Sequence, residues 1–156
     1  MDEPILNAHN KDEYAPAHTA EHLLNQVMVR LFGCERSKNA HIERKKSKIN
    51  WILGSEPTAA QIAEIEKKMN ELIAADLPVR FEFVDRDHIP DGVRLDKLPE
   101  DASEMLRMVR IGDYDICPCI GSHVESTGKI GTFHINSTSW TPMENGGSFR
   151  IVFRTT

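Results

Sequence analysis

The sequence predicts an α+β fold in which two main helices pack on a largely antiparallel β-sheet. Two segments place apolar residues at helical spacing, and several shorter segments alternate apolar with polar residues. The order of these segments along the chain is typical of α+β proteins. The chain has 156 residues, of which 40% are hydrophobic and 28% are charged. We therefore expect a single domain over residues 1–156, large enough to bury a proper core.

The first helix is expected to begin near Pro16 and to end before Gly33. Proline fits the first helical turn because its missing N–H needs no partner there, and glycine readily follows a helix end. The apolar residues at helical spacing between them are Leu24, Val27, Met28 and Leu31. His18 and His22 are four residues apart, so this helix would hold both imidazoles on one face.

The second helix is predicted to open at Pro57-Thr58. The residues of its apolar stripe are Ile62, Ile65, Met69, Leu72 and Ile73. Pro78 blocks continuation of the helix, and Val79–Val84 then alternates as a strand does.

Further strands are expected before and after these helices. The segments with a strand pattern are Asn39–Arg44, Ser47–Leu53, Leu106–Ile111, Ile130–Ile135 and Phe149–Phe153. The first two form a predicted hairpin, and Gly146-Gly147 is the expected turn between the last two. Residues 85–104 are polar and interrupted by proline and glycine, so we expect loops there with a short helix near Glu100–Met105.

Several observations point to a cytoplasmic protein. No apolar run is long enough for a helix that spans a bilayer, and the first residues lack the basic and apolar regions of a signal peptide. The three cysteines, Cys34, Cys117 and Cys119, are an odd number, which argues against a disulfide framework. We therefore expect a cytoplasmic chain without membrane contact.

The charge is unevenly distributed. The net charge of −5 argues against a general nucleic-acid binder. The segment from residue 36 to residue 48 nevertheless holds one acid, Glu43, among six basic residues: Arg36, Lys38, Arg44, Lys45, Lys46 and Lys48. This segment is either a local contact for an anionic partner or a hairpin kept soluble by its lysines.

Two pairs of residues indicate a metal site. His18 and His22 share a helical face, and Cys119 and His123 occur together in a short, turn-rich segment. Three imidazoles and a thiolate are a suitable tetrahedral ligand set for Zn²⁺. The alternatives are surface or core histidines with a structural, reduced cysteine, and Cys117 could replace Cys119 as a ligand.

The first pair also matches the H-x-x-E-H pattern of inverted zinc proteases. Glu21 is the general base in that interpretation, whereas otherwise its side chain simply faces solvent. A protease of this type needs a further carboxylate ligand, and this chain offers a cysteine and a histidine instead. The available ligands therefore argue against a protease of this type and favour a metal site with three histidines and a cysteine.

Two segments resemble the aminoacyl-tRNA editing domain of alanyl- and threonyl-tRNA synthetases, which also occurs in free-standing alanyl-tRNA editing proteins. HTAEHLLNQ at residues 18–26 is similar to the family pattern HTAxHLL. CIGSHVESTGKIGTFHI at residues 119–135 is similar to CGGTHVxNTGxIGxFKI. The resemblance runs from about residue 14 to the end and includes ADLPVRFEF and LRMVRIGDYDICPC. No synthetase core, anticodon module or β-barrel accompanies it, so a free-standing editing protein is expected.

The resemblance implies that His18, His22, Cys119 and His123 bind Zn²⁺. It also implies hydrolysis of the ester between a wrong amino acid and the 3′ end of tRNA, with serine or glycine on alanine tRNA expected first. An alanine pocket excludes neither glycine nor a near-isostere with a hydroxyl well, so a second, hydrolytic site is needed. His18, Cys119 and Asp115 are the expected catalytic residues.

The expected substrate-binding residues are Thr19, Asn39, Cys117, Ile120 and Gly121. Ile120 stands where the family has a glycine beside the metal, so it would narrow the pocket. Asn39 stands about where short alanyl editing proteins carry a threonine that helps to read the serine hydroxyl, and asparagine can also donate and accept. Asp115 and Cys117 lie where threonyl-type domains have a functional acid, so serine on threonine tRNA stays open as a substrate.

The resemblance also favours a function for the basic segment. Arg44, Lys45, Lys46 and Lys48 would hold acceptor-stem phosphates and so position the tRNA without reading its bases. Aminoacyl-tRNA is then the expected partner, and no obligate protein partner is indicated. Two alternatives stay open: a zinc-stabilised tRNA-binding module without turnover, and an unrelated zinc hydrolase with Glu21 as its base.

Overall fold

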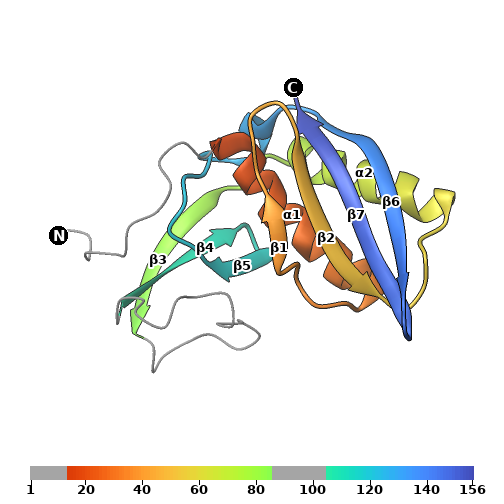
Figure 1. Cartoon of the computed structure of the whole chain (residues 1–156). Coiled ribbons are helices and arrows are strands. Elements are labelled where there is room, and N and C mark those ends of the chain that lie inside the picture. The colour runs from red at the N-terminus through yellow and green to blue at the C-terminus, as the bar shows by residue number, and fades with distance from the viewer. Residues whose placement is uncertain (1–13, 86–104) are drawn as a thin grey trace.

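The computed structural model describes residues 14–85 and 105–156, which contain two α-helices and two antiparallel sheets (Figure 1). The elements are α1 (Ala15–Phe32), β1 (Asn39–His41), β2 (Ser47–Leu53), α2 (Ala59–Ala74), β3 (Val79–Asp85), β4 (Met105–Ile111), β5 (Asp115–Pro118), the 3₁₀ helix η2 (Thr127–Ile130), β6 (Phe133–Met143) and β7 (Gly146–Thr155). The expected α+β class is confirmed. The strands form a four-stranded sheet in the order β1-β2-β7-β6 and a three-stranded sheet in the order β3-β4-β5, a division that the sequence pattern did not indicate.

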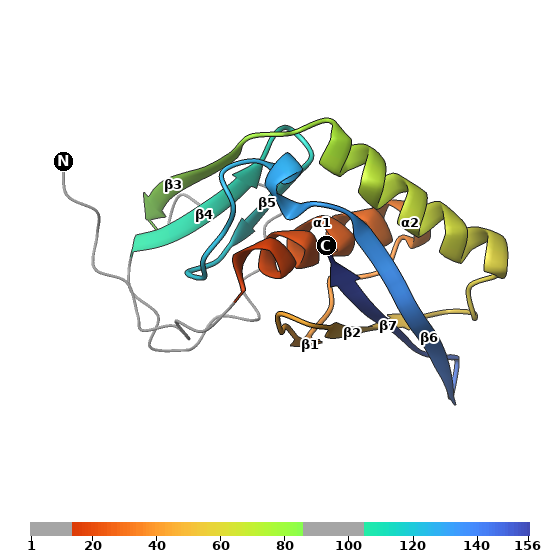
Figure 2. The same ribbon diagram turned by 90° about the horizontal axis from the view of Figure 1, so that it is seen from above.

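Helix α1 lies between the two sheets (Figure 2). It contacts β5 on one side and β2 and β7 on the other, and α2 packs against α1 and β6. Apolar side chains from both helices and both sheets share one core. The largest fully buried side chains include Trp51, Phe133, Phe149 and Phe153, all from the four-stranded sheet. This arrangement buries the face of α1 that carries the two histidines.

Helix α1 begins and ends where the sequence predicts, and α2 begins as predicted and ends at Ala74, before Pro78. Pro16 lies in the first turn of α1, and Gly33 ends the helix in the left-handed conformation, with φ of 66°. Thr58 caps α2 in a reciprocal capping box: the Gln61 N–H donates to the Thr58 hydroxyl at 3.1 Å, and the Thr58 N–H donates to the Gln61 side chain at 2.8 Å. No helix in the described part of the chain is both long and apolar enough to cross a membrane.

The strands differ from the sequence prediction in several places. β1 ends at His41 rather than Arg44, and β6 runs on to Met143 rather than ending at Ile135. The turn between β6 and β7 is formed by Glu144 and Asn145, and Gly146 is already the first residue of β7. Gly146 has φ of 138°, and a side chain there would collide with the Leu53 carbonyl. Ile130 belongs to η2 rather than to a strand, and β5 was not predicted. The helix expected near Glu100–Met105 falls outside the described residues, except that Met105 begins β4.

Buried hydrogen bonds fix α1 relative to the four-stranded sheet. The Asn25 side-chain oxygen accepts from the Trp51 indole N–H at 3.0 Å and from the Ser37 N–H at 2.7 Å. The segment after β5 is fixed in turn by Thr127, whose N–H donates to the Leu77 carbonyl and whose hydroxyl donates to the Leu72 carbonyl. These contacts hold η2 beside the end of α2, while the Val124 N–H donates to the Thr19 hydroxyl and so holds the preceding loop beside the first turn of α1.

Candidate metal centre

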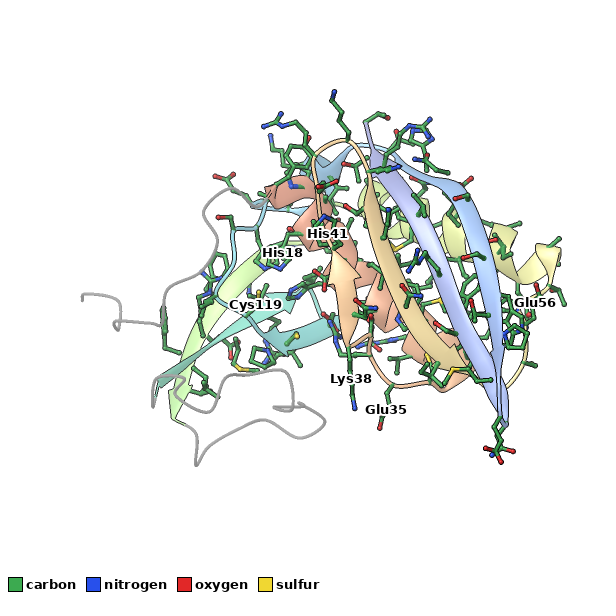
Figure 3. The ribbon with its side chains drawn as sticks, in the orientation of Figure 1. His18, Glu35, Lys38, His41, Glu56 and Cys119 are labelled. Carbon is green, nitrogen blue, oxygen red and sulfur yellow. The ribbon has the colours of Figure 1, made fainter. Side chains whose placement is uncertain are left out.

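His18, His22, Cys119 and His123 meet between α1 and the segment that follows β5. Their ligand atoms all lie within 4.8 Å of one another. His18 and His22 come from successive turns of α1 and are both buried, with 4% of each residue exposed. Figure 3 shows His18 on α1 beside Cys119 on the neighbouring segment. The structure therefore brings together all four residues that the sequence motifs singled out as metal ligands, although their ligand role stays a prediction.

The geometry of this cluster suits a small tetrahedral cation. Zinc bonds of about 2.0–2.3 Å at tetrahedral angles place neighbouring ligand atoms about 3.3–3.8 Å apart. The Cys119 Sγ lies 3.4 Å from the His18 Nε2, within this range. The three imidazole centroids are 4.3–5.0 Å apart. Three nitrogens and one sulfur at these separations could hold a Zn²⁺ ion after small side-chain movements.

Hydrogen bonds behind the cluster orient two of the imidazoles. The His18 Nδ1 lies 3.0 Å from the Ser122 carbonyl oxygen, which can only accept, so Nδ1 carries the proton. The lone pair of His18 is then on Nε2, the atom that faces Cys119. The His123 Nδ1 lies 3.0 Å from the Thr19 hydroxyl, which also accepts from the Val124 N–H. Partners of this kind behind a histidine are typical of metal sites.

Asp115 lies behind His22 and is enclosed by other side chains. Its side chain is fully buried, and one oxygen accepts from Arg36 at 2.6 Å and from Gln26 at 2.9 Å. The other oxygen is 3.9 Å from the His22 Nδ1. Burial alone would lower the pKa of Arg36, but the neighbouring Asp115 and Cys117 outweigh burial and raise it. Arg36 therefore stays charged, and these contacts favour a positioning role for Asp115 over the predicted catalytic role.

Arg107 holds the loop that carries Cys119, and the sequence analysis did not identify it. Its guanidinium donates to the Cys119 carbonyl at 2.8 Å and to the Gly121 carbonyl, and it stacks on the Phe81 ring at 4.4 Å. The buried Gly121 donates its N–H to the Cys119 Sγ at 3.3 Å. Phe81 also lies near His123, with ring centroids 6.2 Å apart. No local pattern marks an arginine in a strand as a loop clamp.

The remaining predicted site residues lie on the loop after β5, on β5, on β1 and in the turn between β1 and β2. Ile120 and Cys117 are half-buried near the cluster, on the loop after β5 and on β5 itself. Asn39 is exposed on β1, where its N–H donates to the Ser37 hydroxyl. The predicted phosphate-binding residues Arg44, Lys45, Lys46 and Lys48 all lie in or beside the turn between β1 and β2.

Cys34, the third cysteine, is not part of the cluster. Burial raises the pKa of its thiol, which keeps the thiol in the neutral form.

Glu21 lies at the cluster and not in open solvent. Only 13% of its side chain is exposed, and a carboxylate oxygen is 3.7 Å from the His18 Nε2. The structure therefore places a carboxylate beside the four candidate ligands. This proximity keeps a general-base role for Glu21 open to test.

Comparison with known proteins shows that this chain is similar to part of tRNA synthetases. A family model described as the threonyl and alanyl tRNA synthetase second additional domain matches residues 106–151. The chain is 30% identical over 151 residues to an alanine–tRNA ligase of Halorubrum lacusprofundi, an alignment that covers 95% of this chain and 16% of that protein. A second alanine–tRNA ligase, from Idiomarina loihiensis, is 28% identical over 85% of this chain and 15% of the relative.

A shorter relative is the alanyl-tRNA editing protein AlaX-L of Pyrococcus horikoshii. It is 32% identical over 118 residues, which cover 76% of this chain and 28% of that protein. The chain thus spans less than a third of the length of these curated relatives. The similarity therefore concerns only part of each relative.

Proposed function

Because this chain belongs to the alanyl-tRNA editing-domain family, we propose that it hydrolyses the ester bond of mischarged aminoacyl-tRNA. The proposed substrates are serine and glycine esterified to alanine tRNA. The observation that supports this most is the meeting of His18, His22, Cys119 and His123 at one point, although they come from two distant motifs. A cytoplasmic location follows from this substrate, and aminoacyl-tRNA is the proposed partner.

Zn²⁺ is the metal in this proposal, held by the Nε2 atom of His18, by the other two imidazoles and by the Cys119 thiolate. A bound Zn²⁺ would supply Lewis-acid polarisation of a carbonyl group or a water molecule that joins these four ligands as a fifth. Ser122 and Thr19 fix the imidazoles of His18 and His123 so that little reorganisation is needed. Asp115 sets the position of His22, and Arg107 holds the carbonyls of the Cys119–Gly121 loop.

Substrate selection is proposed to depend on the residues that flank the cluster. Ile120 is half-buried on the Cys119 loop, where its side chain would limit the room beside a bound ester. A small pocket admits serine and glycine and rejects larger amino acids by overlap. Thr19, Cys117 and Gly121 complete the proposed amino-acid site, and Asn39, exposed on β1, is the residue proposed to read the serine hydroxyl.

The basic turn between β1 and β2 is the proposed contact for the acceptor end. Arg44 stacks on the ring of Tyr14 at 4.7 Å, which connects this turn to the start of α1. Tyr14 precedes His18 by about one helical turn, or roughly 6 Å along the axis. Phosphates held by Lys45 and Lys46 would thus lie on the side of the molecule from which the tRNA end enters.

The direct test is a deacylation panel with one preparation of the protein. Ser-, Gly- and Ala-charged alanine tRNA are compared with Ser-charged threonine tRNA, and bound zinc is measured on the same sample. We expect rapid loss of serine or glycine from alanine tRNA, with the cognate alanine ester spared. Persistence of every mischarged tRNA at full zinc occupancy would refute the proposal and favour a tRNA-binding module. Preferred hydrolysis of Ser-charged threonine tRNA would refute the alanine assignment alone.

A second candidate, a zinc hydrolase that acts on another small ester or a peptide, is favoured by the position of Glu21. The two candidates differ in the variant Glu21→Gln, which keeps the side-chain size and removes the base. A general base contributes about 10²–10⁴-fold, so a loss of this size on a non-tRNA substrate would support the second candidate.

A further inference from the structure

The four-stranded sheet is free of acidic residues although the chain as a whole is acidic. The chain holds 24 aspartates and glutamates in 156 residues, yet β1, β2, β6 and β7, all in the described part of the chain, contain none. The same four strands carry Lys48, Arg150 and Arg154. The charge of this sheet is therefore opposite in sign to that of the whole chain.

The cationic side chains project from the face of the sheet that is turned away from the helices. Residues of β7 alternate, with Phe149, Ile151 and Phe153 buried and with Arg150 and Arg154 exposed. Both α-helices lie on the opposite face of this sheet (Figure 2). We call the exposed side, with Lys48, Arg150 and Arg154, the outer face.

Neutral neighbours hold both arginines on the outer face. The Arg150 Nε donates at 3.1 Å to the Asn50 side chain, which itself donates to the Ser148 hydroxyl at 3.1 Å. Arg154 donates to the Asn136 side-chain oxygen. These amides orient the guanidinium groups and leave their positive charge uncancelled, so the charge is available to an anion.

The outer face is continuous with the basic turn. Lys48 is paired in register with Val152, so it lies between the positions of Arg150 and Arg154 along the sheet. The two arginines are four residues apart, which is about 13 Å along a strand. The cations therefore form one stripe from the middle of β7 to Lys46 and Lys45. One acid of the turn, Glu43, is bound to His41 at 3.0 Å.

We propose that the outer face binds the phosphate backbone of double-stranded tRNA, with Arg150 and Arg154 as its anchoring cations. A-form RNA presents phosphates and 2′-hydroxyls across a wide, shallow minor groove, which an open sheet face with arginine, hydroxyl and amide groups complements. The hydroxyl and amide groups next to the arginines come from Ser148 and Asn50. This inference rests on the proposed function, because the duplex in question belongs to the proposed tRNA substrate.

The test is the double variant Arg150→Ala/Arg154→Ala, with uncharged alanine tRNA as the probe. Each phosphate contact releases about 0.9 counterions. The loss of two contacts therefore makes the negative slope of log K against log salt shallower by about 1.8. At about 0.15 M salt the same change weakens binding by about 30-fold. In the deacylation assay, the weaker tRNA binding should appear as a higher KM. The variant Arg150→Lys/Arg154→Lys keeps both charges and should restore most of the affinity.

The matched control is Lys67→Ala/Arg80→Ala, which removes two exposed cations from α2 and β3 and should leave binding unchanged. An unchanged affinity and salt slope in the Arg150/Arg154 variant, beside a parent that binds and hydrolyses, would overturn this inference alone. A parent that neither binds tRNA nor hydrolyses its ester would overturn the proposed function as well. A dimer in light scattering that this variant dissociates would assign the outer face to a second copy of the chain and overturn the inference.

Discussion

Replacing Asp115 by asparagine separates a positioning role from a catalytic role at the candidate metal centre. The amide keeps the size of the side chain and an acceptor for Gln26, but it removes the charge that faces Arg36 at 2.6 Å and His22 at 3.9 Å. A lost partner behind a metal-binding histidine lowers metal affinity by about 10–100-fold. We therefore expect Asp115→Asn to bind zinc more weakly by that factor and to regain hydrolysis when zinc is in excess.

The same variant should also be less stable. Removing one partner of a buried ion pair costs about 3–5 kcal/mol, and the lower end applies because 19% of the Arg36 side chain is exposed. In a domain of this size 1 kcal/mol moves Tm by about 2–4 °C, so about 3 kcal/mol predicts a Tm lower by about 6–12 °C.

The assay combines a zinc titration against a competing chelator with hydrolysis rates at limiting and at saturating zinc. Asp113→Asn is the control, because it removes a carboxylate of the same type from an exposed position two residues earlier. A loss of several orders of magnitude in hydrolysis at full zinc occupancy would refute the positioning role. Asp115 would then act on the substrate, as the sequence analysis expected.

Three further variants test the candidate ligand His18, the basic turn and the buried acceptor Asn25. His18→Ala should abolish stoichiometric zinc binding and hydrolysis together, which metal analysis of the purified variant checks; full zinc occupancy in that variant would contradict the ligand role. Lys45→Ala/Lys46→Ala should lower the salt slope of tRNA binding by about 1.8 while zinc content stays the same, and an unchanged slope would make the turn ordinary surface. Asn25→Ala leaves the buried N–H groups of Trp51 and Ser37 without their acceptor, so urea unfolding should show a loss of about 2–4 kcal/mol. A loss below about 1 kcal/mol would show that neither N–H group depends on this oxygen.

Local sequence signals were sufficient for both helices. Pro16 and Gly33 bound α1, and the Thr58 capping box opens α2, so the ends follow from residues that satisfy the helix termini themselves. The strand β5 was missed because four residues that end in a proline carry too little pattern, and its pairing with β4 decides its structure. β6 extends past Pro142 because it is an edge strand, where a missing N–H costs no ladder bond.

At the candidate site the sequence predicted the four candidate ligand residues. It did not predict the residues that position those ligands. His18 and His22 share a face because of helical spacing, and their meeting with Cys119 and His123 followed from the motifs. Arg107 lies on a strand twelve residues before Cys119 and carries no motif, so its clamp on the loop is a purely tertiary contact. The packing of Asp115 against Arg36 likewise depends on the fold, and no sequence pattern indicates this ion pair.

The measurement that tests the central claim most directly is the initial rate of Ser-charged alanine tRNA hydrolysis as zinc is added back to metal-free protein. We predict that the rate rises in proportion to bound zinc and reaches its plateau at one ion per chain. Hydrolysis at full rate without metal, or no hydrolysis with one zinc bound per chain, would contradict the claim that these four residues form a metal-dependent editing centre.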